Sequence, residues 1–194
     1  MKKTKVSLLL LAGLISISSF AQNNYKLSTG YSIIINGGSN LHDWKENASS
    51  ATGTLTVNSE ANGTFSITDL NFNVNAKLIK SSEGSIMDNK TFKALNTDKY
   101  PSITFKLTAP VKSIPSNASG FAIAAAGTLT IAGVSKPATL HAKITASGNK
   151  LEVTGSQPIA MSNYGIEPPK AMLGALKVKD NITVDYKTDF VQNN

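Results

Sequence analysis

The chain has 194 residues, of which 19 are basic, 12 are acidic and none is cysteine. Without cysteine the fold has no disulfides, so the burial of apolar side chains has to hold it together. Every basic residue is a lysine, and the lysines are spread singly along the chain. Nucleic-acid recognition relies on clustered basic residues and on the planar fork of arginine. The composition therefore indicates a solvated surface and predicts no nucleic-acid partner.

The first 21 residues have the pattern of a secretory signal peptide. Three lysines precede an apolar run from Val6 to Phe20, and Ser19-Phe20-Ala21 fits the small-x-small rule for cleavage. The run is too short to span a bilayer comfortably, and no second run of this kind follows. We expect cleavage near Ala21 and a periplasmic or secreted product without a transmembrane segment. Residues 22–194 then form one domain with 16 basic and 12 acidic residues, a net charge of +4.

Alternation of apolar and polar residues with a period of two predicts antiparallel strands with one buried face. It is clear in residues 53–59, 102–108, 120–132 and 181–190. In the run 65–78 the apolar phase slips near Asp69, which predicts a β-bulge that bends the strand. Turn sequences rich in Gly, Asn, Ser and Pro separate these runs, so about eight strands are expected, in a sandwich or an up-and-down barrel. Within them we expect Leu55, Ile123 and Ile182 to be ordinary core residues.

One segment, Met87 to Leu95, has the spacing of a helix, on which either Met87, Thr91 and Leu95 or Asp88, Phe92 and Leu95 share a face. We expect Asp88 to be its N-cap, and Lys99-Tyr100-Pro101 to stop the helix before the next strand. No internal repeat and no linker divides the chain.

The stretch His42-Asp43-Trp44 joins one of two histidines to an aspartate and the only tryptophan, and so raises the question of an active site. Neighbouring residues on a strand point to opposite faces, so His42 and Asp43 cannot form a base–orienter pair. The chain has no Gly-x-Ser-x-Gly elbow, no spaced histidine pair, no carboxylates that the sequence pairs and no glycine-rich phosphate loop. His141 alternates onto the polar face of its strand and is expected to face solvent. By elimination we predict a binding protein without catalytic residues, metal or cofactor.

Several motifs follow one another in a recognisable order between about residues 25 and 192. They are SNLHDW at 39–44, a helical segment at 87–96 leading into YPSITF at 100–105, GTLTIAGVSKP at 127–137, SNYGI at 162–166 before Pro168-Pro169, and KVKDNITV at 177–184. In this order they resemble the YceI-like family, whose members are also called polyisoprenoid-binding or lipid-binding periplasmic proteins. Each motif alone is weak, whereas the set is specific.

The resemblance implies a single eight-stranded antiparallel barrel of lipocalin-like shape, with one short helix and an elongated apolar cavity that holds an isoprenoid chain. Eight strands is also the size at which a barrel can enclose one small ligand. The residues expected to line the cavity are inward apolar positions and apolar members of the motifs: Leu41, Trp44, Phe72, Val74, Met87, Phe92, Ile103, Phe105, Met161, Tyr164 and Ile166. We expect His42 or Asp43 to hold a turn or a ligand head group near the opening. Which face of residues 39–44 looks into the barrel stays open.

The favoured function is non-catalytic binding, storage or transport of a polyisoprenoid-type lipid or isoprenoid quinone in the periplasm. Burial of apolar ligand groups, at roughly 0.8 kcal/mol per CH2, outweighs the cost of immobilising a chain of several isoprenoid units. Two alternatives stay open: a metal-dependent or hydrolytic enzyme that uses His42, and a β-sandwich interaction module without a ligand. Transient membrane contact and a homodimer are both compatible with the sequence, which determines neither.

Overall fold

The computed structural model describes residues 22–171, 173 and 175–193, so the expected signal peptide lies outside the described residues. Eight antiparallel strands close into a barrel, because the last strand pairs back to the first. Around the barrel they are β1 (Gln22–Leu27), β4 (Ala51–Ser59), β5 (Thr64–Asn75), β7 (Ser102–Leu107), β9 (Phe121–Ile131), β10 (Val134–Ser147), β11 (Lys150–Ala160) and β14 (Asn181–Gln192). The predicted barrel is confirmed, and the alternative of a sandwich is wrong.

Shorter strands complete the wall at the two ends of the barrel. The first half of β14 pairs with β2 (Ser32–Gly38), which continues the sheet to β3 (Asp43–Ala48) and β6 (Ile79–Ser81). At the opposite end, the first half of β5 pairs with β8 (Val111–Pro115). Two short 3-10 turns, η1 (Ala76–Leu78) and η2 (Met161–Tyr164), and a small hairpin of β12 (Lys170–Ala171) and β13 (Leu176–Lys177) make up the remaining elements.

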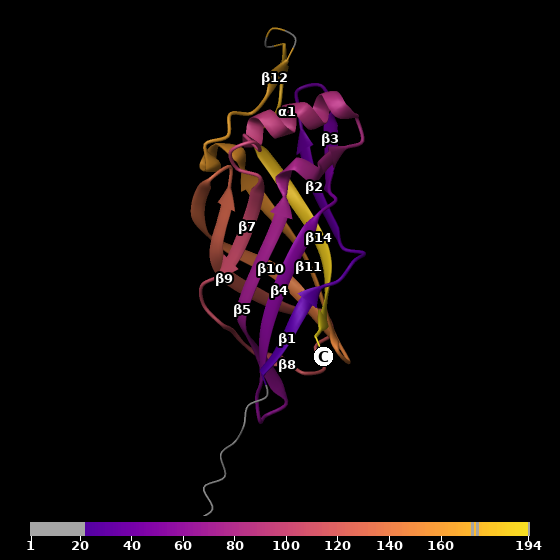
Figure 1. The fold of residues 1–194 in the computed structure, drawn as a ribbon, viewed down its shortest axis with the longest axis vertical. Helices are drawn as coiled ribbons and strands as arrows, with labels where there is room; N and C mark the ends of the chain where they lie inside the picture. Colours follow the sequence, from indigo (N-terminus) through magenta and orange to yellow (C-terminus); the bar gives the residue numbers. More distant parts are fainter. Residues whose placement is uncertain (1–21, 172, 174, 194) are drawn as a thin grey trace, which may run out of the picture.

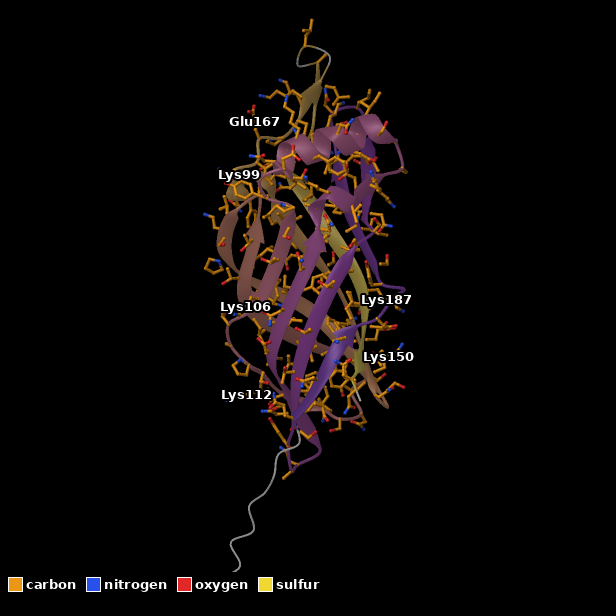
Figure 2. All side chains as sticks on the ribbon, viewed as in Figure 1. Lys99, Lys106, Lys112, Lys150, Glu167 and Lys187 are labelled. Carbon is orange, nitrogen blue, oxygen red and sulfur yellow. The ribbon has the colours of Figure 1, made fainter. Side chains whose placement is uncertain are left out.

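The helix α1 (Ser85–Leu95) lies across one end of the barrel, next to the β12–β13 hairpin (Figure 1). We call this the lid end, and the end near β1 and β8 the far end. The labelled lysines in Figure 2 lie at different heights between these ends, in keeping with a solvated basic surface. In the described part of the chain, no helix is long and apolar enough to cross a membrane.

The predicted bulge in β5 is confirmed. Thr56 on β4 pairs with Asp69, but the next residue, Val57, pairs with Ile67, so Thr68 is the extra residue. Before the bulge Phe65 and Ile67 are buried, and after it Val74 is buried, so the bulge keeps the apolar side chains on the inner face although their spacing is odd. The strand ends at Asn75, earlier than the alternation suggested, because its side chain accepts a hydrogen bond from the backbone N–H of Lys77 and starts η1.

The helix differs from the prediction at its start. It begins at Ser85, and Gly84 is the N-cap without a side-chain capping bond, so the prediction that Asp88 caps the helix was wrong. Asp88 lies in the first turn, where its carboxylate accepts hydrogen bonds from the Ser81 backbone N–H at 2.7 Å and from Lys80 Nζ at 3.0 Å. These bonds fasten the helix to β6. The helix ends at Leu95, as expected, with Asn96 in the left-handed conformation.

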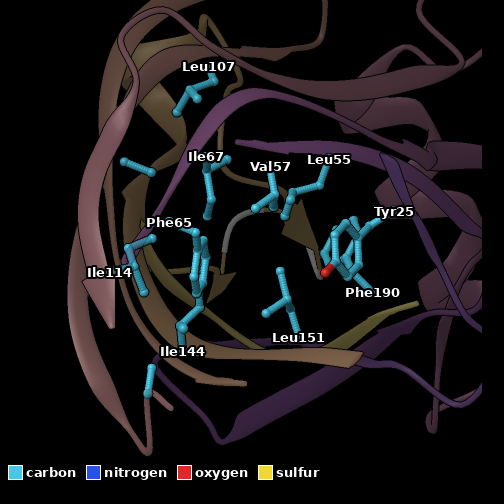
Figure 3. Packing of buried hydrophobic residues seen from close by; sticks show 12 residues of the cluster. Tyr25, Leu55, Val57, Phe65, Ile67, Leu107, Ile114, Ile144, Leu151 and Phe190 are labelled. Carbon is cyan, nitrogen blue, oxygen red and sulfur yellow. The ribbon is translucent and has the colours of Figure 1, made fainter. Parts of the chain in front are cut away.

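The far half of the barrel is a filled hydrophobic core (Figure 3). Leu55, Ile114 and Ile144 are completely or almost completely buried there, and Ile123 packs against the cluster to which they belong. The cluster consists of Tyr25, Leu55, Val57, Phe65, Ile67, Leu107, Ile114, Ala118, Ala125, Ile144, Leu151 and Phe190. The expected core roles of Leu55 and Ile123 are confirmed, whereas Ile182 borders a cavity in the other half.

Candidate functional site

The lid half of the barrel encloses a cavity of about 210 Å³. Its apolar lining comes from both sides of the barrel and from α1: Ile33, Ile35, Trp44, Ala48, Phe72, Val74, Ile79, Met87, Ala94, Leu95, Ile103, Phe105, Leu129, Ile131, Leu140, Ile159, Met161, Ile166, Pro169, Val178, Ile182 and Val184. At about 24 cal/mol per Å³ of void, an unfilled cavity of this size costs on the order of 5 kcal/mol. That is a large share of the stability of a domain, so the cavity is a candidate ligand site rather than a packing defect.

Met87, Thr91 and Leu95 of α1 border the cavity, so of the two helical faces that the sequence allowed this is the one that looks inward. They lie three or four residues apart, so they project from one side of the helix. Pro169 and Val178, at the two ends of the segment that holds the β12–β13 hairpin, border the same cavity. The helix and this segment therefore cover the lid end of the cavity together.

Eight of the eleven residues expected to line a cavity do border it: Trp44, Phe72, Val74, Met87, Ile103, Phe105, Met161 and Ile166. The structure brings them together from β3, β5, α1, β7, η2 and the loop after η2. Whether they contact a lipid stays a prediction. The remaining three, Leu41, Phe92 and Tyr164, lie elsewhere.

The expected place of Leu41 in the lining was wrong, because Leu41 is 71% exposed. The chain leaves the sheet between β2 and β3, where Ser39 Oγ accepts hydrogen bonds from the backbone N–H groups of Leu41 and His42, both at 3.1 Å. This serine-centred turn interrupts the strand alternation, so His42 does not share the face of Trp44.

Phe92 and Tyr164 do not border the cavity either. Phe92 is half-buried on α1, and Lys80 Nζ lies 5.2 Å from the centre of its ring. Tyr164 is buried in η2, where it packs in a cluster with Met161 and Ile166. Burial also raises the pKa of the Tyr164 hydroxyl. Tyr164 thus packs behind cavity-lining residues, whereas Phe92 lies beside Lys80 on the helix.

His42 and Asp43 are exposed and do not border the cavity. His42 Nε2 lies 2.9 Å from Glu83 Oε1, so His42 ties the turn before β3 to the segment before α1. The alternative that they hold a turn fits His42, and whether either residue contacts a ligand head group stays a prediction. His141, as predicted, is exposed.

The open question about the orientation of residues 39–44 is resolved by β3. Trp44, Glu46 and Ala48 are buried, and the residues between them are exposed. The Trp44 indole lies over Gly37, because a Cβ added to Gly37 would come within 2.1 Å of Trp44 Cζ2. Glycine therefore makes room for the only tryptophan at the cavity wall.

Glu46 is the residue that sequence reasoning missed. It is 4% exposed and borders the apolar cavity, where its Oε1 accepts a hydrogen bond of 2.5 Å from Thr91 Oγ1 on α1. Burial raises the pKa of Glu46; the bond from Thr91 opposes this shift, while the charges of Asp88 and Glu83 add to it. Continuing the alternation from Trp44 to Ala48 would have placed Glu46 inside the barrel.

A further polar atom at this wall lacks a partner among the described residues. The buried Nε1–H of Trp44 has no hydrogen-bond acceptor there. Of the two carboxylate oxygens of Glu46, it is Oε1 that accepts the bond from Thr91. Among the described residues, no group of three or more His, Cys, Asp or Glu side chains is placed to hold a metal ion.

The comparison with known proteins agrees with this architecture. The YceI-like domain matches residues 31–190. The UPF0312 protein YE1254 of Yersinia enterocolitica is 37% identical over 92 residues, a match that covers 47% of this chain and 39% of that relative. The matched part therefore spans less than half of the relative's length.

Solved structures share the fold at low sequence identity. A polyisoprenoid binding domain from Saccharophagus degradans, implicated in plant cell wall breakdown, has a TM-score of 0.66 at 13% identity, over 87% of this chain and 98% of that one. Burkholderia cenocepacia BcnA has a TM-score of 0.63 at 15% identity, over 82% of this chain and 95% of that one. The YCEI protein of Campylobacter jejuni has a TM-score of 0.58 at 19% identity, over 77% of this chain and 84% of that one. With the family domain matched over most of its length, the chain belongs to the YceI-like family.

Proposed function

We propose that this protein binds a polyisoprenoid-type or other long-chain apolar lipid in the lid-end cavity, and that it stores or transports this lipid without catalysis. The observation that supports this function most directly is the apolar cavity in the lid half of the barrel, whose far half is filled with side chains. The polyisoprenoid binding domain from Saccharophagus degradans, which shares the fold, supports the same ligand class.

The energetics favour an apolar chain as the occupant. Each CH2 group transferred from water into the cavity contributes roughly 0.8 kcal/mol, and the ligand also removes the cost of the void. Isoprenoid chains, including those of isoprenoid quinones, supply such groups in branched units that match a wall of Ile, Val, Leu and Phe side chains. A cavity that works in this way needs no reactive group.

The alternative of an enzyme that uses His42 receives no support from the site. His42 pairs with Glu83 at the surface and does not border the cavity. Hydrolytic chemistry requires a base within hydrogen-bond reach of a bound substrate. A lipid in the cavity would be out of reach of this imidazole.

Extraction of the purified protein tests the proposed function. The full chain is purified from its native host, extracted with organic solvent, and the extract is analysed by mass spectrometry. We expect a recurrent polyprenyl or quinone mass, with much less of it in a Val184→Phe variant, in which the larger side chain occupies the cavity. A protein that carries no lipid in several preparations and takes up no polyprenyl alcohol in vitro would overturn the proposal.

We also propose that the protein works in the periplasm. The lysines, apolar run and small residues of 1–21 support export and cleavage at the end of that segment. N-terminal sequencing of protein from a periplasmic extract should begin near Gln22. Recovery of the uncleaved chain from the cytoplasm alone would contradict this location.

Exchange of a lipid with a membrane requires contact, and we propose that the lid end makes it. Leu41, Ile86 and Leu173 are 71%, 74% and 110% exposed. Asn40, beside Leu41, bonds through its side chain to Ala175 and Lys177 at the hairpin. All three apolar side chains therefore belong to the lid end, around the cover of the cavity.

Charge at the lid end fits an anionic membrane surface. Lys93 on α1, Lys177 in β13 and Lys179 two residues after it are exposed. Exposed aliphatic residues bordered by lysines are the pattern of peripheral proteins that dock on anionic bilayers. Shallow insertion at this end would bring the lipid phase next to the cavity cover.

Co-sedimentation with vesicles tests the membrane contact. We expect more binding to vesicles that contain phosphatidylglycerol than to pure phosphatidylcholine, and a loss of that binding in a Leu41→Ser, Ile86→Ser double variant. Phe121→Ser is the matched control, since Phe121 is 38% exposed on β9 where it pairs with Ile144 of the far half. Equal binding of wild type and double variant would refute the docking surface.

A further inference from the structure

The cavity is apolar except at a few side chains, and the polar group most deeply buried in it is Glu46. A carboxyl group in such surroundings needs hydrogen-bond partners, because burying it without them is costly. Thr91 satisfies Oε1 only. The second oxygen is left for a group that enters the cavity.

Trp44 adds a donor to the same wall. It is two residues from Glu46 on the same face of β3, so the two side chains start about 7 Å apart. The indole is more than nine-tenths buried, borders the cavity, and its Nε1–H has no acceptor among the described residues. Buried polar groups in native proteins almost always have a partner, so this donor points to a ligand.

The charges around this wall select against anions. No lysine borders the cavity in the part of the chain that the structure describes. Glu46 itself is a carboxyl group, and Asp88 and Glu83 are close enough to act on its ionisation. A phosphate or carboxylate placed here would meet the Glu46 carboxyl group, while Lys80, which pairs with Asp88 at 3.0 Å, does not border the cavity.

From this arrangement we infer that Trp44 and Glu46 form a head-group subsite for a lipid whose head is uncharged and carries a carbonyl or hydroxyl oxygen. This inference rests on the proposed lipid-binding function and names the class of head group. The Trp44 N–H donates to the head-group oxygen. Glu46 accepts from a hydroxyl when ionised, or donates to a carbonyl when protonated.

Three probes with one isoprenoid chain and different heads separate these contributions: farnesol, farnesyl phosphate and the hydrocarbon farnesene. Equilibrium dialysis with radiolabelled probes gives the dissociation constants without using tryptophan fluorescence. The wild-type protein should bind farnesol about tenfold more tightly than farnesene, the gain expected from one or two hydrogen bonds. It should bind farnesyl phosphate at least tenfold more weakly than farnesol, because the anion is repelled and loses its hydration.

Two variants test which residue causes each difference in affinity between farnesol and the other two probes. Trp44→Phe keeps an aromatic ring but removes the donor, and should bring the farnesol-to-farnesene ratio close to one. Glu46→Gln keeps the shape of the side chain but removes its charge. It should reduce the ratio of the farnesyl phosphate dissociation constant to the farnesol dissociation constant about tenfold. The matched control is Glu152→Gln, because Glu152 pairs with Lys187 at 2.9 Å outside the cavity; it should leave both ratios at the wild-type values.

The outcomes distinguish the inference from the proposed function. Failure of all three probes to bind would contradict the proposed function itself. Binding of all three with one affinity, or tighter binding of farnesyl phosphate than of farnesol, would overturn the head-group subsite while lipid binding stands. Wild-type ratios in both folded variants would also overturn it. The wild-type ratios decide the question even if a variant does not fold.

Discussion

The two halves of this barrel are made from the same long strands, yet one is solid and the other hollow. β9 contributes Ala125 to the far core and Leu129 and Ile131 to the cavity wall, and β14 contributes Phe190 to the core and Val184 to the wall. Inward alternation is the same in both halves. The difference therefore lies in what fills and closes each end.

The two halves do not differ in the kinds of side chain that they hold, since aromatic residues and alanines occur in both. Tyr25, Phe65 and Phe190 lie within the far core (Figure 3), whereas Trp44 and Phe72 line the cavity. What differs is the closure, because at the lid end a helix lies across the barrel (Figure 1) and borders the cavity. An apolar interior is thus used for stability at one end and is available for a ligand at the other.

Truncation of one isoleucine in each half should give the largest contrast. Ile144→Ala removes a fully buried side chain from the far core and should lower the free energy of unfolding by about 3–4 kcal/mol. Ile131→Ala enlarges a cavity that already exists and should cost about 1–2 kcal/mol, because fewer packing contacts are lost. Urea denaturation of the ligand-free proteins measures both values. Equal losses would remove the distinction between the halves.

Enlargement of a valine in each half should give the opposite pattern. Val57→Phe overpacks the far core and should cost about 1–3 kcal/mol. Val184→Phe has free volume to enter, so its stability should stay within about 1 kcal/mol of wild type while its affinity for farnesol falls at least tenfold. Denaturation and dialysis check the two effects separately. A Val184→Phe protein with unchanged affinity would show that the ligand lies elsewhere.

Gly37→Ala should disturb the cavity wall through its tryptophan. The added Cβ would overlap the Trp44 ring, so the indole has to move, at a cost of about 1–3 kcal/mol. Since Trp44 is the only tryptophan, its fluorescence emission reports the movement without interference. An unchanged emission spectrum would contradict the close packing of Trp44 on Gly37.

The smallest expected effect is a pH dependence in the lid half. Burial raises the pKa of Glu46 above the value of 4.5 for the free side chain, so the folded protein holds this proton after the unfolded chain has lost it. The stability that the protonated Glu46 contributes is present below about pH 4.5, and it is lost as the pH rises through the pKa of Glu46 in the folded protein. Glu46→Gln should therefore gain thermal stability relative to wild type as the pH rises above about 4.5.

The variant has to be compared with wild type at each pH, because other carboxylates change the stability of the protein with pH in the opposite direction. Hydrogen bonds lower the pKa of Asp98, Glu167 and Asp180, so their contribution is lost as the pH falls. A melting-temperature difference between Glu46→Gln and wild type that stays constant with pH would refute the raised pKa. The Glu152→Gln variant serves as the control at the outer surface.

Local patterns in the sequence were enough to predict most of the barrel strands and part of the cavity lining. Alternation and turn chemistry predicted the strands, and the slipped phase near Asp69 predicted the bulge at Thr68. Eight cavity residues followed from inward positions and family motifs, because a closed barrel turns one face of each strand inward.

The errors at Leu41, His42 and Asp88 and the omission of Glu46 share one physical cause, namely hydrogen bonds made by side chains. The turn at Ser39 depends on a hydroxyl that accepts two backbone N–H groups, and it moved Leu41 and His42 out of the strand pattern. Asp88 looked like a helix cap but is used to hold α1 against β6. The bond between Glu46 and Thr91 joins residues that are 45 positions apart, which no local pattern reveals.

The central claim is that a lipid occupies the lid half, and contact quenching of Trp44 tests it most directly. Trp44 is the only tryptophan and borders the cavity. Titration with a dibrominated long-chain alcohol should quench its fluorescence saturably at one equivalent, because bromine quenches an indole only at contact distance. The unbrominated alcohol should compete and restore the emission. Binding of the brominated alcohol by dialysis without quenching of Trp44 would contradict the account.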